Sequence, residues 1–244
     1  MTRLSVNLNK IALLRNSRGR DFPNVLDFAQ KFIHLGVKGI TIHPRQDERH
    51  ITRQDAYDLG AILARHDDVE FNIEGYPSDD FLQLIDDVKP DQCTLVPDAP
   101  DQLTSDHGWD FTTQAETLAP ILARIKAAGV RAAVFLDPDL QQVEAAAQSQ
   151  ADRIELYTEA YASAFGTEKQ AETLDLYRQA ALRAQALGLG VNAGHDLDLK
   201  NLPDFLTIPG ILEVSIGHVL TVECIEQGMT FVTRQYLDVC SRGA

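Results

Sequence analysis

The sequence contains few cysteines and no long apolar run. Its three cysteines, Cys93, Cys224 and Cys240, share no metal-site spacing, and their odd number suits a reducing compartment. No stretch approaches the roughly 18 uncharged apolar residues needed to cross a bilayer, and the first residues carry no signal-peptide pattern. We therefore expect a cytoplasmic protein that does not span a membrane.

Positive charge is also scarce. The chain has 22 Lys and Arg against 36 Asp and Glu, which gives a net charge of −14 at pH 7. This balance argues against nucleic acid or an anionic membrane as a partner, although a local cationic pocket could still bind anionic small molecules. Hydrophobic residues make up 44% of the chain and no Pro/Gly/Ser linker divides it, so we expect a single domain over residues 1–244.

Short apolar, β-branched runs alternate with amphipathic helical patterns along the chain. The predicted strands are Leu4–Leu8, Gly39–His43, Glu70–Glu74, Gln92–Val96, Val130–Leu136, Arg153–Tyr157, Leu189–Ala193 and Glu213–Gly217. The predicted helices are Asn24–Leu35, Thr52–Arg65, Ser78–Val88, Thr113–Ala128, Pro138–Gln148, Glu168–Leu187, Leu199–Phe205 and Val219–Val239. The alternation predicts an α/β protein, a closed (β/α)8 TIM barrel. An open doubly wound sheet is the alternative, but no Gly-x-Gly-x-x-Gly follows the first strand.

In such a barrel the active site lies at the carboxyl ends of the strands. His43 and His195 end the second and seventh predicted strands, on opposite sides of the ring, so a substrate between them could meet an acid and a base. Glu74 follows apolar Ile73, which favours a partly desolvated carboxyl group with a raised pKa. The alternative for Glu74 is an ion pair with Arg45 or another nearby cation.

Two cationic regions and two glycine-bearing strand ends indicate phosphate sites. Arg15–Arg20 forms a cationic loop after the first strand, and Arg45, Arg49 and His50 form a second cluster. Phosphate in this fold usually binds after strands seven and eight, where the chain has Ala193–Asp196 and Ile216–His218. Two sites suit two phosphorylated substrates or one bisphosphate. The arginine-rich loop could equally be a solvated surface or a subunit contact.

Two other chemistries remain open from the residues alone. His43, Glu74 and His195 could hold a divalent metal, although no HxH or HExxH spacing supports this. Lys10, close to the barrel mouth, could form a Schiff base with a ketone or act as a charged partner for phosphate or carboxylate.

A series of motifs, taken in order, resembles the pyridoxine 5′-phosphate synthase family. The resemblance covers nearly the whole chain and implies a (β/α)8 barrel with additional helices. It implies a transferase of vitamin B6 biosynthesis that condenses 1-deoxy-D-xylulose 5-phosphate with 3-amino-2-oxopropyl phosphate to pyridoxine 5′-phosphate, phosphate and water. No metal or organic cofactor is expected. The matching segments are Val6–Gly19, Gly39–Arg45, Arg49–Ile51, Asn72–Glu74, Leu95–Pro97, Ile154–Leu156, Val191–His195 and Ile216–His218.

The resemblance also implies residue roles. His43 and Glu74 would accept protons, His195 would donate one, and Glu155 would stabilise charge in the transition state. The loop from Pro97 to Asp110 would close as a lid, and the protein would be a homo-octamer built from dimers, with Arg18 reaching a neighbouring site. The amino-ketone phosphate would be bound by Asn7, Arg18, the amide of Asp196, Gly217 and His218, and the deoxyxylulose phosphate by Arg45, His50 and Thr104.

Two places depart from the family pattern. Many members have Asp-His where this chain has Asn9-Lys10, which leaves the roles of both residues open. Many have Gly in place of Asp196, so we expect that only the amide of Asp196 helps to bind phosphate and that its side chain turns away. Two other functions stay open: a catalytically silent barrel that binds phosphorylated ligands, and a metal-dependent phosphosugar isomerase or aldolase. A silent homologue should have lost a proton shuttle, and metal analysis would identify the isomerase or aldolase.

Overall fold

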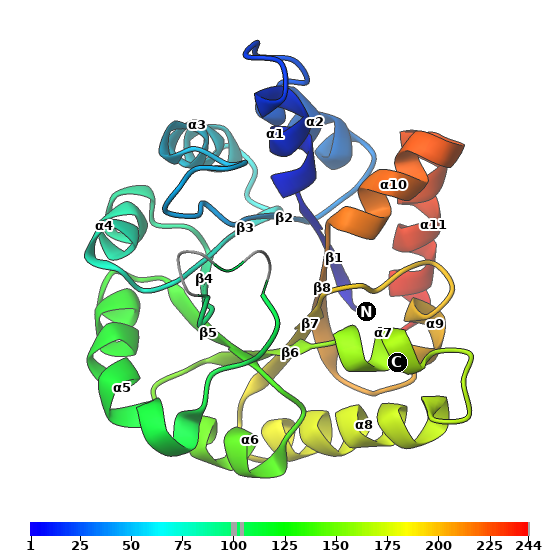
Figure 1. Ribbon diagram of the computed structural model, residues 1–244. Coiled ribbons are helices and arrows are strands. Elements are labelled where there is room, and N and C mark those ends of the chain that lie inside the picture. The colour runs from blue at the N-terminus through cyan, green and yellow to red at the C-terminus, as the bar shows by residue number, and fades with distance from the viewer. Residues whose placement is uncertain (99–101, 103–104, 244) are drawn as a thin grey trace.

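Eight parallel strands close into a barrel. The computed structural model describes residues 1–98, 102 and 105–243. The strands pair in chain order and β1 pairs with β8, so the predicted (β/α)8 TIM barrel is confirmed and the open sheet is wrong (Figure 1). The strands are β1 (Arg3–Asn7), β2 (Gly39–Ile42), β3 (Glu70–Gly75), β4 (Gln92–Leu95), β5 (Arg131–Leu136), β6 (Arg153–Tyr157), β7 (Gly190–Gly194) and β8 (Ile211–Ile216).

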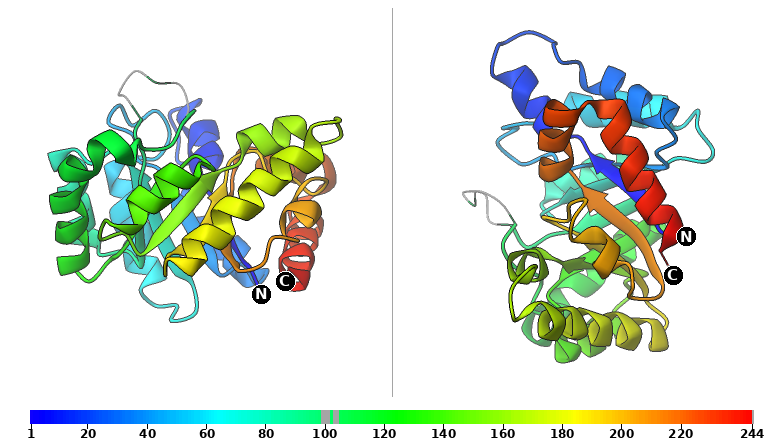
Figure 2. Two further views of the ribbon diagram at one scale, coloured as in Figure 1. Left: turned by 90° about the horizontal axis from the view of Figure 1, so that it is seen from below. Right: turned by 90° about the vertical axis from the view of Figure 1, so that its right-hand side faces the viewer.

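The helices form a ring around the strands, and the two ends of the chain meet at one end of the barrel (Figure 2). The amide of Thr2 donates to the carbonyl oxygen of Cys240 at 3.2 Å. None of the helices in the described part of the chain is long and apolar enough to cross a membrane. They are α1 (Asn9–Asn16), α2 (Val25–His34), α3 (Arg53–Leu63), α4 (Asp79–Val88), α5 (Phe111–Ala127), α6 (Leu140–Ala147), α7 (Glu159–Ala164), α8 (Gln170–Ala186), α9 (Leu202–Phe205), α10 (His218–Gln227) and α11 (Met229–Arg242).

The helices differ from the prediction in number as well as by a few residues at their ends. Helices α1 and α7 were not predicted; both are short and neither begins with a side-chain cap. The predicted helix Val219–Val239 is two helices, because Gly228 adopts φ +93°, which a continuing helix cannot contain. The predicted cationic loop Arg15–Arg20 is also wrong at its start, since Arg15 belongs to α1.

The inside of the barrel is largely polar, whereas most apolar strand residues face the helices; Phe135 in β5 is an exception and faces the opening at the carboxyl ends of the strands. Hydrogen bonds between strands that are not neighbours cross the interior: Asn192 in β7 donates to Gln92 in β4 at 3.3 Å. Nearer the carboxyl ends, Ser215 in β8 donates to Glu74 in β3 at 3.4 Å. Most barrels of this fold fill the interior with branched apolar residues. Here the polar filling gives the floor of the mouth a set of buried ionisable groups.

Candidate active site

A cavity of about 560 Å³ opens at the carboxyl ends of the strands. It is lined by ten of the twelve residues that the sequence predicts for the site. A second hollow, of about 700 Å³, adjoins it between the starts of α3 and α4 and shares His43 and Arg45. The ten residues are Asn7, His43, Arg45, His50, Glu74, Glu155, His195, Asp196, Gly217 and His218.

His43 and Glu74 form a buried pair in this cavity. Nδ1 of His43, just after β2, lies 3.8 Å from Oε2 of Glu74 in β3, and the side chains are 7% and 12% exposed. Burial lowers the pKa of His43 well below its ordinary value, and Arg45 adds to the shift. Burial and the neighbouring Glu155 raise the pKa of Glu74 well above its ordinary value, in the direction predicted. The imidazole of His43 is therefore unprotonated at neutral pH, and the carboxyl group of Glu74 keeps its proton to a higher pH than an exposed glutamate does.

The ends of β1 and β8 hold this pair in place. Asn7 donates to Oε2 of Glu74 at 3.5 Å, and Ser215 donates to Oε1 at 3.4 Å. Oδ1 of Asn9 accepts the backbone N–H of His43 at 2.9 Å. Asn9 therefore fixes the main chain at His43, which is one structural role for a position where the chain departs from the family pattern.

Glu155 lies deeper, on β6. It is 2% exposed, and its Oε2 has no hydrogen-bond partner among the described residues. Burial, followed by repulsion from Glu213, raises the pKa of Glu155 to about 8. Burial raises the pKa of Glu213 to about 7. Glu155 at the cavity wall and Glu213 below it thus hold protons to a higher pH than exposed glutamates do.

His195 and Asp196 follow β7 in an unusual backbone conformation. Their φ angles are +88° and +57°, in the left-handed region that L residues rarely adopt. Thr158 stabilises this turn: its hydroxyl donates to the carbonyl oxygens of Gly194 and His195 at 2.7 and 2.5 Å. The ring of His195 lies edge-on to Tyr157, with the ring centres 4.9 Å apart. The turn directs the side chain of Asp196 to His195.

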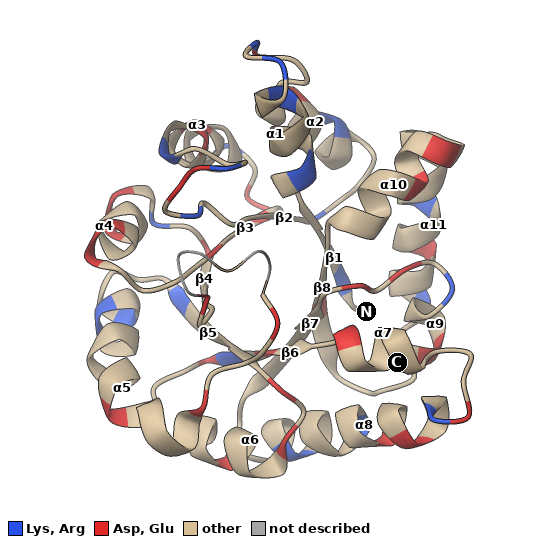
Figure 3. Cartoon of the chain, viewed as in Figure 1, with Lys and Arg blue, Asp and Glu red and all other residues tan. Residues whose placement is uncertain are grey.

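One side of the cavity is cationic. Arg45 forms an ion pair with Asp98, so the predicted alternative of an Arg45–Glu74 pair is wrong. Arg45 and Arg49 both donate to the carbonyl oxygen of Gln102, at 2.7 and 3.1 Å. Burial and these arginines lower the pKa of His50 to about 4, so its imidazole is neutral. Figure 3 shows the basic residues of this region on the segment between β2 and α3.

The opposite side is formed by the start of α10. Gly217 precedes this helix and His218 is its first residue. The first amides of a helix have no partner within the helix and favour an anion. A Cβ at Gly217 would lie 2.9 Å from Cβ of Asn7, so only glycine fits the close approach of β8 to β1. Lys10 in α1 also lines the cavity.

The chain matches the family described as "Pyridoxal phosphate biosynthesis protein PdxJ" over residues 4–242. It belongs to this family. A pyridoxine 5′-phosphate synthase from Cytophaga hutchinsonii is 51% identical over 239 residues, covering 97% of this chain and 98% of that protein. One from Porphyromonas gingivalis is 48% identical, covering 98% of each. The fold is also that of 3-hexulose-6-phosphate synthase from Salmonella typhimurium, at a TM-score of 0.66, 16% identity and full coverage of both chains.

One predicted site residue of this PdxJ-family chain lies away from the cavity, and another lies outside the described residues. Arg18 is exposed on the loop between α1 and α2, which projects beyond the ring of helices and does not line the cavity (Figure 1). Thr104 lies outside the described residues, as does part of the predicted lid, Pro97–Asp110.

Sequence reasoning missed Asp98 and Ser215. Asp98 is buried, pairs with Arg45 and has Oδ2 3.9 Å from Nε2 of His43. Its place directly after the fourth predicted strand was the available signal. Ser215 could have been found because it alternates with Gly217 along the eighth strand. In the described part of the PdxJ-family chain, no three His, Cys, Asp or Glu side chains are grouped to hold a metal ion.

Proposed function

We propose that this chain is a pyridoxine 5′-phosphate synthase that condenses 1-deoxy-D-xylulose 5-phosphate with 3-amino-2-oxopropyl phosphate, releasing phosphate and water. The buried His43–Glu74 pair, with 3.8 Å between Nδ1 and Oε2, carries the proposal. Membership of the PdxJ family and relatives named as this synthase support it. Imine formation, enolisation and dehydration all move protons, and a buried imidazole beside a buried carboxyl group suits repeated transfers.

His43 and Glu74 act as proton acceptors. The imidazole is unprotonated at neutral pH, because burial lowers its pKa. Burial raises the pKa of Glu74, so its readiness to accept a proton depends on the charges beside it. A positively charged amine or imine next to it supplies the missing counter-charge and favours the ionised form. The substrate thus activates the base when it enters, and water outside the cavity does not compete for the proton.

His195 donates a proton on the opposite side of the cavity, and Glu155 stabilises positive charge as it develops. With a pKa of about 8, Glu155 is mostly protonated at neutral pH, and positive charge beside it favours the ionised form. A buried carboxyl group of this kind can ionise as positive charge develops on the reacting nitrogen, and no solvent molecule needs to take part. These roles match the residue types at the carboxyl ends of β6 and β7.

The two phosphates bind at opposite sides. Arg45, His50 and Thr104 hold the deoxyxylulose phosphate. The amino-ketone phosphate is held by Asn7, Arg18, the amide of Asp196, Gly217 and His218. The enzyme works in the cytoplasm as a homo-octamer built from dimers, and Arg18 of one subunit completes the site of its neighbour. The exposure of Arg18 on a projecting loop, away from the cavity of its own chain, supports this arrangement.

The direct test is to incubate the purified protein with both phosphates and a metal chelator and to follow pyridoxine 5′-phosphate. We expect product from the natural protein. Glu74→Gln is the matched variant, because glutamine keeps the size and hydrogen bonding of glutamate but cannot accept a proton. It should fold normally and lose about 100-fold or more in turnover. No product from the natural protein would overturn the function, and near-normal turnover by Glu74→Gln would remove the assigned role.

A further inference from the structure

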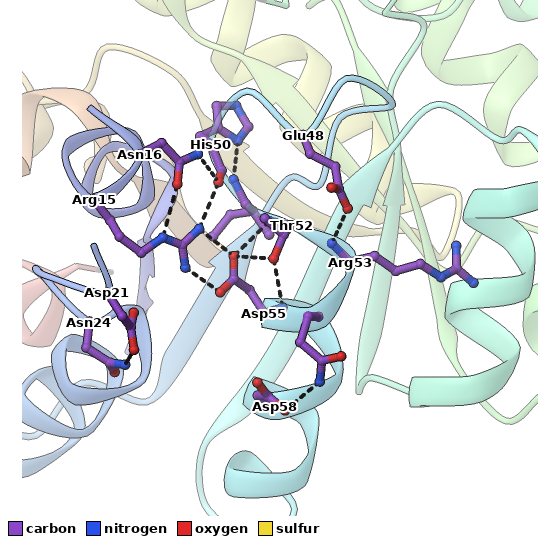
Figure 4. Close-up of polar contacts among 12 residues, drawn as sticks. Arg15, Asn16, Asp21, Asn24, Glu48, His50, Thr52, Arg53, Asp55 and Asp58 are labelled. Atoms are coloured by element: carbon purple, nitrogen blue, oxygen red, sulfur yellow. Dashed lines mark hydrogen bonds and ion pairs between the residues drawn. The ribbon is translucent and has the colours of Figure 1, made fainter. Parts of the chain in front are cut away.

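Arg15 and Asp55 form a buried ion pair between α1 and α3, outside the cavity (Figure 4). Nη1 and Nη2 of Arg15 donate to Oδ1 and Oδ2 of Asp55 at 2.5 and 2.8 Å. The side chains are only 11% and 8% exposed, and neither lines the cavity. A two-point pair of this kind fixes the relative position of its two helices closely.

The same helix end holds the backbone of His50. Nη2 of Arg15 donates to the carbonyl oxygen of His50 at 3.2 Å. Nδ2 of Asn16 donates to that oxygen at 2.8 Å and to the carbonyl oxygen of Arg49 at 3.2 Å. Two side chains of α1 therefore bind the main chain of a segment whose own side chains line the cavity.

Asp55 holds the segment from the other end. Its Oδ2 accepts the backbone N–H of Thr52 at 2.7 Å and the hydroxyl of Thr52 at 2.9 Å (Figure 4). Between these anchors, Nδ1 of His50 accepts the backbone N–H of Ile51 at 2.9 Å. Since Nδ1 is an acceptor, the neutral ring carries its proton on Nε2 and can donate only from there.

We propose that Arg15, supported by Asn16 and Asp55, positions His50 so that its Nε2–H donates to the phosphate of the deoxyxylulose substrate. The inference rests on the proposed function. Arg15 is a positioning residue, because it contacts the main chain of His50 and not the substrate. Lysine cannot replace it: a single ammonium group does not bind both carboxylate oxygens and a carbonyl oxygen in this planar geometry.

The test is calorimetric binding of 1-deoxy-D-xylulose 5-phosphate to the full-length protein. Arg15→Lys should weaken binding about tenfold and Asn16→Ala about threefold, while affinity for the amino-ketone phosphate stays unchanged. In a His50→Ala background, Arg15→Lys should have no further effect, because its influence passes through His50. Arg124→Lys is the matched control, since Arg124 pairs with Asp86 between α5 and α4 and does not line the cavity.

Equal weakening for both phosphates, or a full tenfold loss in the His50→Ala background, would show general loosening and overturn the inference. If Arg15→Lys does not fold, Asn16→Ala decides, because it leaves the ion pair intact. If product forms but the affinity for the deoxyxylulose phosphate does not depend on Arg15, the inference is rejected and the proposed function stands. If the affinity for the deoxyxylulose phosphate depends on Arg15 but no product forms, the proposed function is rejected and the positioning role of Arg15 stands. A natural protein that does not bind the deoxyxylulose phosphate overturns both.

Discussion

Oδ2 of Asp196 lies 2.8 Å from Nδ1 of His195. The two residues are consecutive, and both have positive φ angles. A carboxylate there accepts a hydrogen bond from Nδ1–H and so orients the imidazole. Hydrogen bonding to His195 lowers the pKa of Asp196, so the carboxylate stays ionised. The side chain of Asp196 therefore has a partner of its own.

We predict that Asp196→Asn lowers kcat about 10-fold or more with little change in KM. The amide of asparagine can donate to Nδ1 and hold the other tautomer of His195, and it lacks the negative charge that favours a ring with protons on both nitrogens, the form in which Nδ1 bonds to residue 196 while Nε2 donates. Nitrogen-15 NMR of the imidazole distinguishes the two tautomers. Asp196→Gly, which restores the residue common in the family, should retain more activity than Asp196→Asn. The reverse order of activities would contradict an orienting role.

The strands were predictable and some helices were not. The apolar face of each predicted strand packs against helices. The local sequence pattern of a strand therefore reflects its contacts with segments far away in the chain. Helix α1 was not predicted, because its first residues, Asn9 and Lys10, are polar and line the cavity, so they do not contribute to an apolar stripe. The break at Gly228 was not predicted, because a glycine within a helical pattern does not by itself indicate a positive φ angle.

The gathering of His43, Glu74 and His195 followed from the fold, because parallel strands bring their carboxyl ends to one rim. The ion-pair partner of Arg45 did not follow from the fold. Arg45 selects Asp98 rather than Glu74, a result of side-chain geometry after the fourth strand that no spacing encodes. The surroundings of Arg18 depend on any neighbouring subunit, and the sequence of a single chain does not give contacts between subunits.

Glu155→Gln should change how stability depends on pH. The pKa of Glu155 is about 8 in the folded protein and near 4.5 ordinarily, so the folded state binds more protons between these values. Its contribution to stability is complete below pH 4.5 and is lost as pH rises to 8. Relative to the natural protein, Glu155→Gln should gain at least about 2 °C in Tm between pH 5 and pH 8. A Tm difference that does not vary with pH would contradict the shifted pKa.

Arg18→Ala should raise KM for the amino-ketone phosphate about tenfold without changing stability, because Arg18 is exposed and touches no part of its own cavity. Arg20→Ala, on the same exposed loop, is the control. Mixed oligomers of Arg18→Ala and His43→Asn should regain activity at low substrate, since some sites then combine an intact His43 with an intact neighbouring Arg18. A fully active monomer in sedimentation would refute the shared site.

Lys10 tests whether the departures from the family pattern preserve the chemistry. Its positive charge lowers the pKa of both His50 and Asp196, so it acts on both sides of the cavity. An ammonium group has three donors and no acceptor, whereas the histidine common at this position can also accept a proton. Lys10 is therefore suited to hold an anionic substrate between the two phosphate sites and unsuited to replace a histidine base.

We predict that Lys10→Arg, which keeps the charge but cannot form an imine, retains measurable activity with a raised KM. Lys10→Met should lose more, because it removes the charge and all three donors while keeping similar apolar bulk. Borohydride added with the deoxyxylulose phosphate should leave Lys10 unmodified in mass spectrometry, since a residue that only binds substrate forms no reducible carbon–nitrogen double bond. A reduced adduct on Lys10 together with an inactive Lys10→Arg protein would instead establish covalent catalysis by this lysine, because charge alone would then be insufficient.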